Sequence, residues 1–413
     1  MSRAHTYPPP SSNKQFYIAC NRECPRRSID CQRLYRWLVA NNWRFARNTR
    51  RADLIIICTC ASTDYNENTS LFNIKAALKK KAPSARLVVT GCLTKVNPET
   101  IRDLGNFITI PPRQLDDFDK LLESGVSIAD IPEEGIVLVP DFVREENFFI
   151  NRATRFLSKA RLSRAFIKSC IEHAKRASTR EPQTPSYDIK VAEGCLGNCS
   201  YCCIRFATGR LQSKPLPQVV REFETGLRKG HRLFKLVGID TGCYGLDMGT
   251  TVVPLLEQIF GFKDEFTLIL SDFNPQWLLA YYDQLFPLFL RNSSRLKEIS
   301  LPIQSGSDRL LRAMKRPYKI EDVRTKVRDL RKQVPGVRFI THVVVGFPGE
   351  TAEDFDETKR LLEECLFDRV AVYEYNDRPN TESSKMEGKV RAETIEERAR
   401  VLRDMMARRG SLA

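Results

Sequence analysis

The stretch GCLGNCSYCC, residues 194–203, follows the apolar run IKVA and decides how the rest of the chain is interpreted. Its cysteines Cys195, Cys199 and Cys202 have the spacing CxxxCxxC. Three thiolates held this closely on one loop can ligate three irons of a 4Fe–4S cluster and leave the fourth iron without a protein ligand. Two glycines within the loop let it bend around such a group. Zinc is the alternative, but it needs a fourth ligand, and Cys203 is poorly placed to supply it.

On both sides of this loop, short apolar runs rich in β-branched residues alternate with helical periodicity. That pattern is typical of a parallel sheet with crossover helices. Residues 14–142 form one block, with expected strands QFYIA, ADLIIICTC and ARLVVTGC and a possible last strand IVLVPDF. Residues 187–390 form a second block of six strand–helix units, which suggests an open or partial (β/α)6 barrel. A charged helix is expected over 391–413, so the sequence predicts an α/β chain with two main domains.

The charge of the chain favours an anionic partner. Lys and Arg exceed Asp and Glu by 66 to 51, a net charge of +15, which fits nucleic acid but also plain solubility. Nine basic residues and one acid lie between Arg152 and Arg180. We interpret residues 143–186 as a basic helical linker, either a solvated helix or a contact surface for phosphates. Residues 1–13 are polar and rich in Pro and Ser, and we expect a disordered lead-in there.

The cysteine content indicates in which cellular compartment the protein works. Thirteen cysteines in a chain with no visible export signal favour metal ligands or catalytic groups over disulfides. No apolar run approaches the roughly 20 residues that span a bilayer, and the first residues offer no secretory signal. We therefore expect a cytoplasmic protein without a membrane partner.

The cysteine loop resembles the signature of the radical S-adenosylmethionine (SAM) superfamily. The stretches LPIQSGSDRLLRAMKRPY (301–318) and VVVGFPGETAEDFDET (343–358) resemble two blocks of its methylthiotransferase branch, and the resemblance covers roughly residues 14–400. It implies that the cluster on the loop binds SAM through its open iron and that reduction then releases a 5′-deoxyadenosyl radical. An electron donor such as a flavodoxin or ferredoxin is implied as well.

Three further residues are expected at the SAM site. Tyr201 matches the aromatic position of the signature, which lies beside the adenine in the family. Asp240 follows an expected strand and faces the expected active site, although a helix N-cap or turn former is an alternative role. Gln304 belongs to the first of the two methylthiotransferase blocks.

The resemblance also implies a flavodoxin-like N-terminal domain with a second 4Fe–4S cluster. Cys60 and Cys92, each at the end of an apolar strand, fall where the family places two of its ligands. For the first ligand Cys24 suits the family register of Cys followed by Asp and a helix, and Cys20 is a rival. We expect the remaining cysteines to be core or incidental thiols; they are Cys31, Cys58, Cys170, Cys243 and Cys365.

The sequence is compatible with two classes of substrate. VGIDTGCYGLDMGTTVVPLL (237–256) looks most like the archaeal and eukaryotic-type enzymes that methylthiolate threonylcarbamoyladenosine in tRNA. Family members normally end in a TRAM barrel, and the 23 residues after Val390 are too few for one. A peptide or protein side chain is therefore the second hypothesis, and a non-catalytic iron–sulfur sensor is a third.

Overall fold

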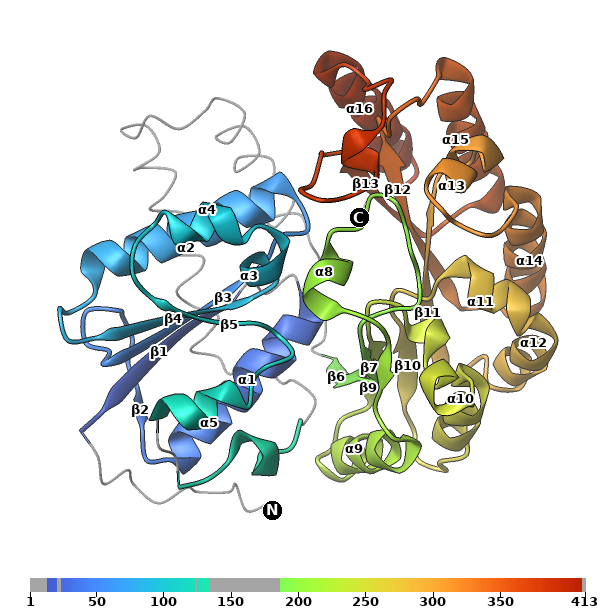
Figure 1. Ribbon diagram of the computed structural model, residues 1–413. Helices are drawn as coiled ribbons and strands as arrows, with labels where there is room; N and C mark the ends of the chain where they lie inside the picture. The colour runs from blue at the N-terminus through green and yellow to red at the C-terminus, as the bar shows by residue number, and fades with distance from the viewer. Residues whose placement is uncertain (1–12, 21–23, 123–124, 134–185, 411–413) are drawn as a thin grey trace. The chain divides into compact units, whose positions relative to one another are not determined.

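The computed structural model describes residues 13–20, 24–122, 125–133 and 186–410. The chain divides into two compact units, and each is described by itself (Figure 1). Unit 1 is Met1–Ser186 with Phe206–Thr208, and unit 2 is Tyr187–Arg205 with Gly209–Ala413. The expected lead-in up to residue 12, the expected strand IVLVPDF and the expected basic linker up to residue 185 lie outside the described residues.

Unit 1 contains a five-stranded parallel sheet with the order β2-β1-β3-β4-β5. The strands are β1 (Gln15–Cys20), β2 (Arg44–Phe45), β3 (Leu54–Thr59), β4 (Arg86–Gly91) and β5 (Ile108–Ile110). The central strand β3 is buried along its whole length, because helices cover both of its faces. This burial explains its uninterrupted apolar sequence LIIICT.

The helices of unit 1 connect its strands as crossovers. They are α1 (Pro25–Ala40), α2 (Asp64–Lys80), α3 (Leu93–Val96), α4 (Pro98–Arg102) and α5 (Asp117–Leu122). Pro25 starts α1, where a missing N–H costs nothing and the fixed φ suits the first helical turn. Trp37 of α1 and Phe118 of α5 pack with Phe16 and Leu54 of the sheet in one buried cluster.

Unit 2 contains a six-stranded parallel sheet whose order, β13-β12-β11-β10-β9-β6, follows the chain. The strands are β6 (Tyr187–Lys190), β9 (Leu233–Val237), β10 (Thr267–Leu270), β11 (Leu296–Gln304), β12 (Arg338–Val345) and β13 (Arg369–Glu374). The short strands β7 (Ala192–Glu193) and β8 (Gln212–Ser213) pair antiparallel beside the cysteine loop. Six parallel strands in sequential order are the open barrel that the sequence predicts.

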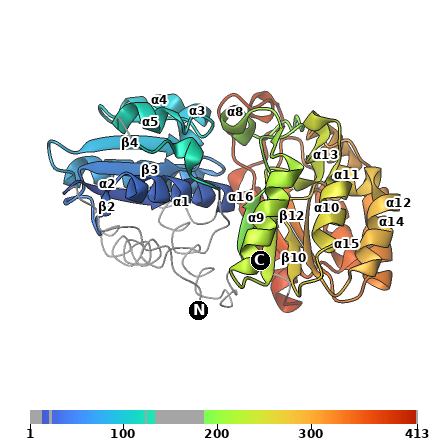
Figure 2. The same ribbon diagram turned by 90° about the horizontal axis from the view of Figure 1, so that it is seen from below.

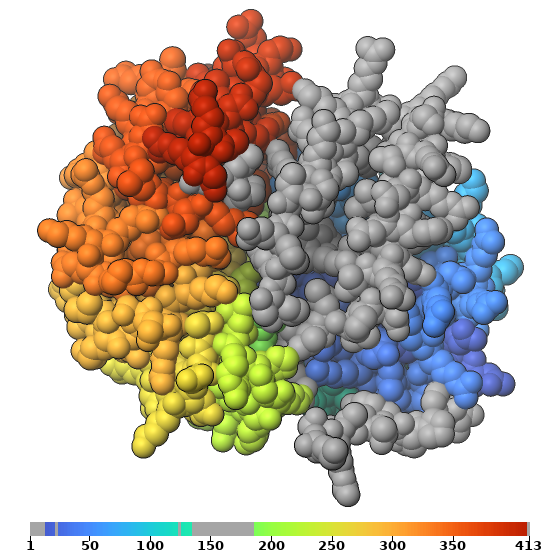
Figure 3. Space-filling view, turned by 180° about the vertical axis from the view of Figure 1, so that it is seen from behind, coloured from blue at the N-terminus to red at the C-terminus, as the bar shows by residue number. Residues whose placement is uncertain are grey.

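Helices lie along one side of this sheet (Figures 1 and 2). They are α9 (Leu216–Arg228), α10 (Val252–Phe260), α11 (Pro275–Ala280), α12 (Tyr282–Arg291), α13 (Asp308–Ala313), α14 (Ile320–Gln333), α15 (Ala352–Cys365) and α16 (Ala392–Arg408). The short helix α8 (Ile204–Thr208) directly follows the cysteine loop. Apolar residues of these helices and of the strands form one large core. Seen from behind, the side chains of unit 2 form a continuous surface (Figure 3).

The predicted fold class is confirmed: a parallel-sheet N-terminal unit precedes a parallel-sheet unit with the architecture of a partial barrel. The expected C-terminal helix is α16. Among the described helices, none is both long and apolar enough to cross a bilayer.

Candidate functional site

The cysteine loop of unit 2 follows β7 and ends where α8 begins. The backbone N–H of Gly197 donates a hydrogen bond to Cys195 Sγ at 3.0 Å. A Cβ added to Gly197 would lie 3.1 Å from Cys195 Sγ and 3.8 Å from Cys199 Sγ. Two of the predicted ligand sulfurs therefore turn toward the same glycine, and a side chain there would occupy the space between them.

Cys202 lies close enough to Cys199 for their charges to interact. Burial and, to a smaller extent, the like charge of the neighbouring Cys199 together raise the pKa of Cys202 to about 12. Such buried thiols stay protonated unless a cation stabilises their thiolates. The three cysteines that the sequence predicts are thus brought together, and this donor set fits a 4Fe–4S cluster with one iron free of protein ligands.

Arg316 is a residue of this site that the sequence analysis did not single out, although it lies within the 301–318 block. Its Nη1 lies 3.7 Å from Cys199 Sγ and donates to it. Its Nε donates to Tyr318 Oη at 3.2 Å, and its Nη2 donates to the carbonyl oxygen of Pro302. These contacts hold a buried positive charge beside a predicted cluster ligand, where it offsets the negative charge of thiolates.

Asp240 is held rigidly near the carboxyl end of β9. It accepts hydrogen bonds from Trp277 Nε1 at 2.7 Å, the Gly242 N–H at 3.1 Å and the Asn274 N–H at 3.2 Å. Burial raises the pKa of Asp240 to about 6, although the bond from Trp277 acts to lower it. Asp240 also acts as a turn former, because its side chain accepts the Gly242 N–H at the start of a 3-10 turn. Its carboxylate lies within 4.8 Å of Cys195 Sγ.

Tyr201 and Gln304, the other residues expected to contact SAM, come from different elements. Tyr201 packs against the small buried cluster that includes Met314 and Phe347. Burial raises its pKa well above the usual value, so it stays a neutral phenol. Gln304 ends β11 with a φ of 78°, a left-handed conformation that non-glycine residues rarely adopt.

In unit 1, Cys60 and Cys92 follow the adjacent strands β3 and β4. Thr59 and Gly91 are partners in the parallel register, and the Cys92 N–H donates to the Thr59 carbonyl oxygen at 3.0 Å. Gly91 has a φ of 92°, and a Cβ there would lie 2.2 Å from that same oxygen. Only glycine permits this close turn, which carries Cys92 to the strand edge where Cys60 lies.

Cys24 lies at the N-terminus of α1, in the N-cap position. Burial raises the pKa of both Cys60 and Cys92, and the charge of Cys24 raises each further. The three predicted ligands of the second cluster are therefore close enough to influence one another. Soft thiolates at converging strand ends and a helix N-terminus fit a 4Fe–4S cluster.

Cys20, the rival first ligand, belongs to a different group. In the described residues, two groups of three Cys, His, Asp or Glu side chains have ligand atoms all within 4.8 Å of one another. One is Cys20, Cys31 and Cys58, and the other is Cys195, Asp240 and Cys243. Hydrogen bonds from Cys31 and Cys58 lower the pKa of Cys20 to about 6.

Both units of the chain are similar to known protein families. Residues 189–362 match the radical SAM superfamily and residues 21–110 match uncharacterized protein family UPF0004. A probable threonylcarbamoyladenosine tRNA methylthiotransferase of Archaeoglobus fulgidus is 30% identical over 361 residues, covering 87% of this chain and 76% of that protein. The ribosomal protein uS12 methylthiotransferase RimO of Desulforamulus reducens is 29% identical, covering 91% and 78%.

Among solved structures, the radical SAM methyltransferase TsrM of Kitasatospora setae has a TM-score of 0.60 at 14% identity, covering 90% of this chain and 77% of that one. This likeness bears on the fold alone. The sequence relatives and the two family matches agree with one another. This chain belongs to the radical SAM methylthiotransferases, enzymes that transfer sulfur-containing groups with SAM and two 4Fe–4S clusters as cofactors.

Proposed function

We propose that this enzyme methylthiolates a modified adenosine of tRNA. The observation that carries the proposal is the agreement between the 237–256 stretch and a relative named for threonylcarbamoyladenosine tRNA methylthiotransferase. The net charge of +15 supports an RNA substrate, because phosphate contacts are made by Lys and Arg. A flavodoxin or ferredoxin as electron donor and a cytoplasmic location are further parts of the proposal.

The ligand assignment is part of the same proposal. Cys195, Cys199 and Cys202 would hold the cluster that binds SAM, while a second set in unit 1 would hold the auxiliary cluster. That second set is Cys24, Cys60 and Cys92. When bound, SAM and the two clusters supply hydrogen abstraction from an unactivated carbon and the sulfur that replaces the hydrogen.

The chain's own residues would position these groups. The missing side chain of Gly197 keeps the space beside the sulfurs of Cys195 and Cys199 free of a Cβ. Arg316 stabilises negative charge on Cys199 by its hydrogen bond. Asp240 offers a buried carboxylate, fixed by three donors, to a positive group of SAM. Tyr201 offers an aromatic surface to the adenine, and Gln304 a polar amide at the end of β11.

Anaerobic reconstitution tests the proposal. The full chain is loaded with iron and sulfide, incubated with SAM, reductant and bulk tRNA, and the nucleosides are analysed by mass spectrometry. We expect about eight irons per chain, from two clusters of four, and a nucleoside heavier by one methylthio group. Unchanged tRNA despite eight irons and 5′-deoxyadenosine formation would refute the RNA substrate.

Paired cysteine variants test the ligand assignment. Cys24→Ala is expected to reduce the iron content to about four per chain, whereas Cys20→Ala leaves it near eight. Cys199→Ala is expected to abolish SAM cleavage, with Cys365→Ala, a buried thiol of α15, as the matched control. The opposite result for the first pair would assign the auxiliary ligand to Cys20.

A protein side chain is the second candidate substrate, because the RimO relative is as similar as the tRNA-modifying ones. A salt series separates the two. Binding through roughly six or more phosphates weakens by orders of magnitude between about 50 and 200 mM salt. A neutral peptide would show little of this slope. The third hypothesis, a non-catalytic sensor, does not fit the enzyme family to which the chain belongs.

A further inference from the structure

We propose that Cys20, Cys31 and Cys58 form a separate site for one zinc-class cation in unit 1. These three thiols are not among the proposed ligands of either cluster. The site does not depend on the proposed substrate, because it rests on the packing of α1 against β1 and β3 alone.

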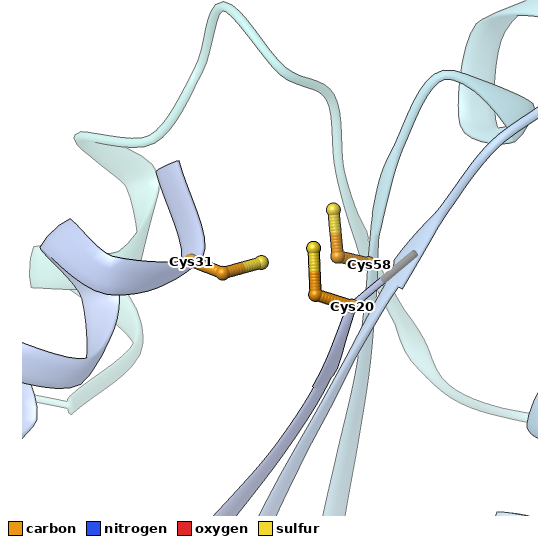
Figure 4. Close-up of side chains that lie close together, drawn as sticks. All are labelled: Cys20, Cys31 and Cys58. Atoms are coloured by element: carbon orange, nitrogen blue, oxygen red, sulfur yellow. The ribbon is translucent and has the colours of Figure 1, made fainter. Parts of the chain in front are cut away.

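The parallel register of the sheet places two of the thiols side by side. Cys20 and Cys58 are direct partners on the adjacent strands β1 and β3, so their side chains leave the same face of the sheet. Helix α1 covers that face and directs Cys31 toward them (Figure 4). All three sulfurs lie within 4.8 Å of one another.

This spacing suits one ion and not a cubane cluster. Two ligands bound to one zinc at about 2.3 Å can be no more than about 4.6 Å apart, and tetrahedral geometry places them at about 3.8 Å. In a 4Fe–4S cluster each cysteine binds a different iron, so its ligands are separated by an iron–iron edge as well. The sets assigned above to the clusters are wider, since neither belongs to the groups within 4.8 Å.

The surroundings shield the trio from water. Cys31 is 2% exposed and Cys58 7% exposed, so an ion there would be shielded from water. Three thiolates and one divalent cation leave a single negative charge, which lies near the buried ion pair of Arg27 and Asp30. Ser28 Oγ lies 3.8 Å from Cys20 Sγ and supplies an oxygen beside the trio. Because Ser28 and Cys31 are three apart on α1, they lie on the same helix face.

Metal analysis of the loaded full chain tests this site. The protein is reconstituted anaerobically with iron, sulfide and zinc, washed with EDTA, and its iron and zinc are counted by mass spectrometry. We expect about one zinc per chain beside about eight irons. Cys31→Ser should lose the zinc and keep the iron. Cys365→Ser, which changes another fully buried helical thiol, should keep both.

Zinc-edge X-ray absorption of the unaltered protein supplies a readout that needs no variant. Three sulfur neighbours at about 2.3 Å are expected. An unaltered protein that retains no zinc, or a Cys31→Ser protein that retains it, would overturn the proposal and leave the trio as core thiols. Loss of about four irons in Cys31→Ser would overturn it in another way, by assigning the trio to the auxiliary cluster.

Discussion

Asp354 joins the two sequence blocks that identify the family, and we predict that Asp354→Asn destabilises unit 2. Its carboxylate accepts a hydrogen bond from Ser307 Oγ at 2.6 Å and is paired with Arg309, both from the 301–318 block. It also accepts the Thr351 N–H at 2.8 Å and completes a capping box at the start of α15. One side chain thus fastens α15 to the start of α13 and caps α15.

The magnitude follows from these contacts. The carboxylate is 5% exposed, so its bonds from Ser307 and Thr351 are made with little water present. A hydrogen bond to a charged group contributes about 1.5–3 kcal/mol, and a lost N-terminal cap costs about 1 kcal/mol. The Arg309 side chain is 52% exposed and adds little. Because asparagine keeps one acceptor oxygen, we expect a loss of roughly 2–3 kcal/mol, or about 5–10 °C in melting temperature for a domain of this size.

Hydrogen exchange of the cluster-loaded protein is the appropriate assay, because it resolves the two units. Peptides from α13 and α15 should exchange faster in Asp354→Asn, while peptides from β1 and β3 in unit 1 should not change. Asp356→Asn is the matched control on α15, since Asp356 is exposed and pairs only with Lys359 among the described residues. Equal exchange in the two variants would refute the reasoning.

The loss of stability in Asp354→Asn should depend on pH. Burial alone would raise the pKa of Asp354, but the hydrogen bonds from Arg309, Ser307 and Thr351 outweigh it and hold the pKa well below its usual value. A carboxyl with a lowered pKa in the folded state contributes stability above its unfolded pKa of about 3.9. That contribution is lost as the pH falls below this value. The difference in the free energy of unfolding between the parent protein and Asp354→Asn should therefore become smaller on acidification below about pH 4.

Three further changes address the proposed sites. Gly91→Ala would place a Cβ 2.2 Å from a β3 carbonyl oxygen, so we expect iron to fall to about four per chain in metal analysis, with SAM cleavage retained. Arg316→Met removes the hydrogen bond to Cys199, which contributes about 1–2 kcal/mol. The reduction potential of the cluster proposed on the cysteine loop should therefore become about 40–90 mV more negative. A redox titration followed by electron paramagnetic resonance measures this shift. Trp277→Phe removes the indole donor that orients Asp240, and should raise the SAM concentration for half-maximal 5′-deoxyadenosine formation about 5- to 30-fold.

Much of the fold was predictable because its main strands are long and apolar. The runs ADLIIICTC and ARLVVTGC correspond to β3 and β4, since a strand buried between helices needs apolar residues on both faces. The edge strands β2 and β5 were not predicted. They are two and three residues long, too short for any periodicity to appear in the sequence.

The cysteine loop was predictable for a similar reason, because its three thiols are separated by only a few residues. Asp240 was expected near the loop because it follows a strand, whereas Arg316 could not be placed beside it from spacing alone, since it reaches the loop from the segment after α13. Cys243 was interpreted as incidental, yet it lies within 4.8 Å of Cys195. Such distant positions come together only when the strands of the parallel sheet are placed side by side in the fold.

The choice between Cys20 and Cys24 shows what the register adds to the sequence. Cys20 pairs with Cys58, two residues before Cys60, so it lies about 6.6 Å back from the strand edge at which Cys60 and Cys92 emerge. Its sulfur faces Cys31 on the α1 side of the sheet. Cys24 lies beyond the strand, at the helix N-terminus, and its charge reaches both edge cysteines. The proposed assignment therefore gives Cys24 to a cluster at that edge and Cys20 to the tighter group that suits a single ion.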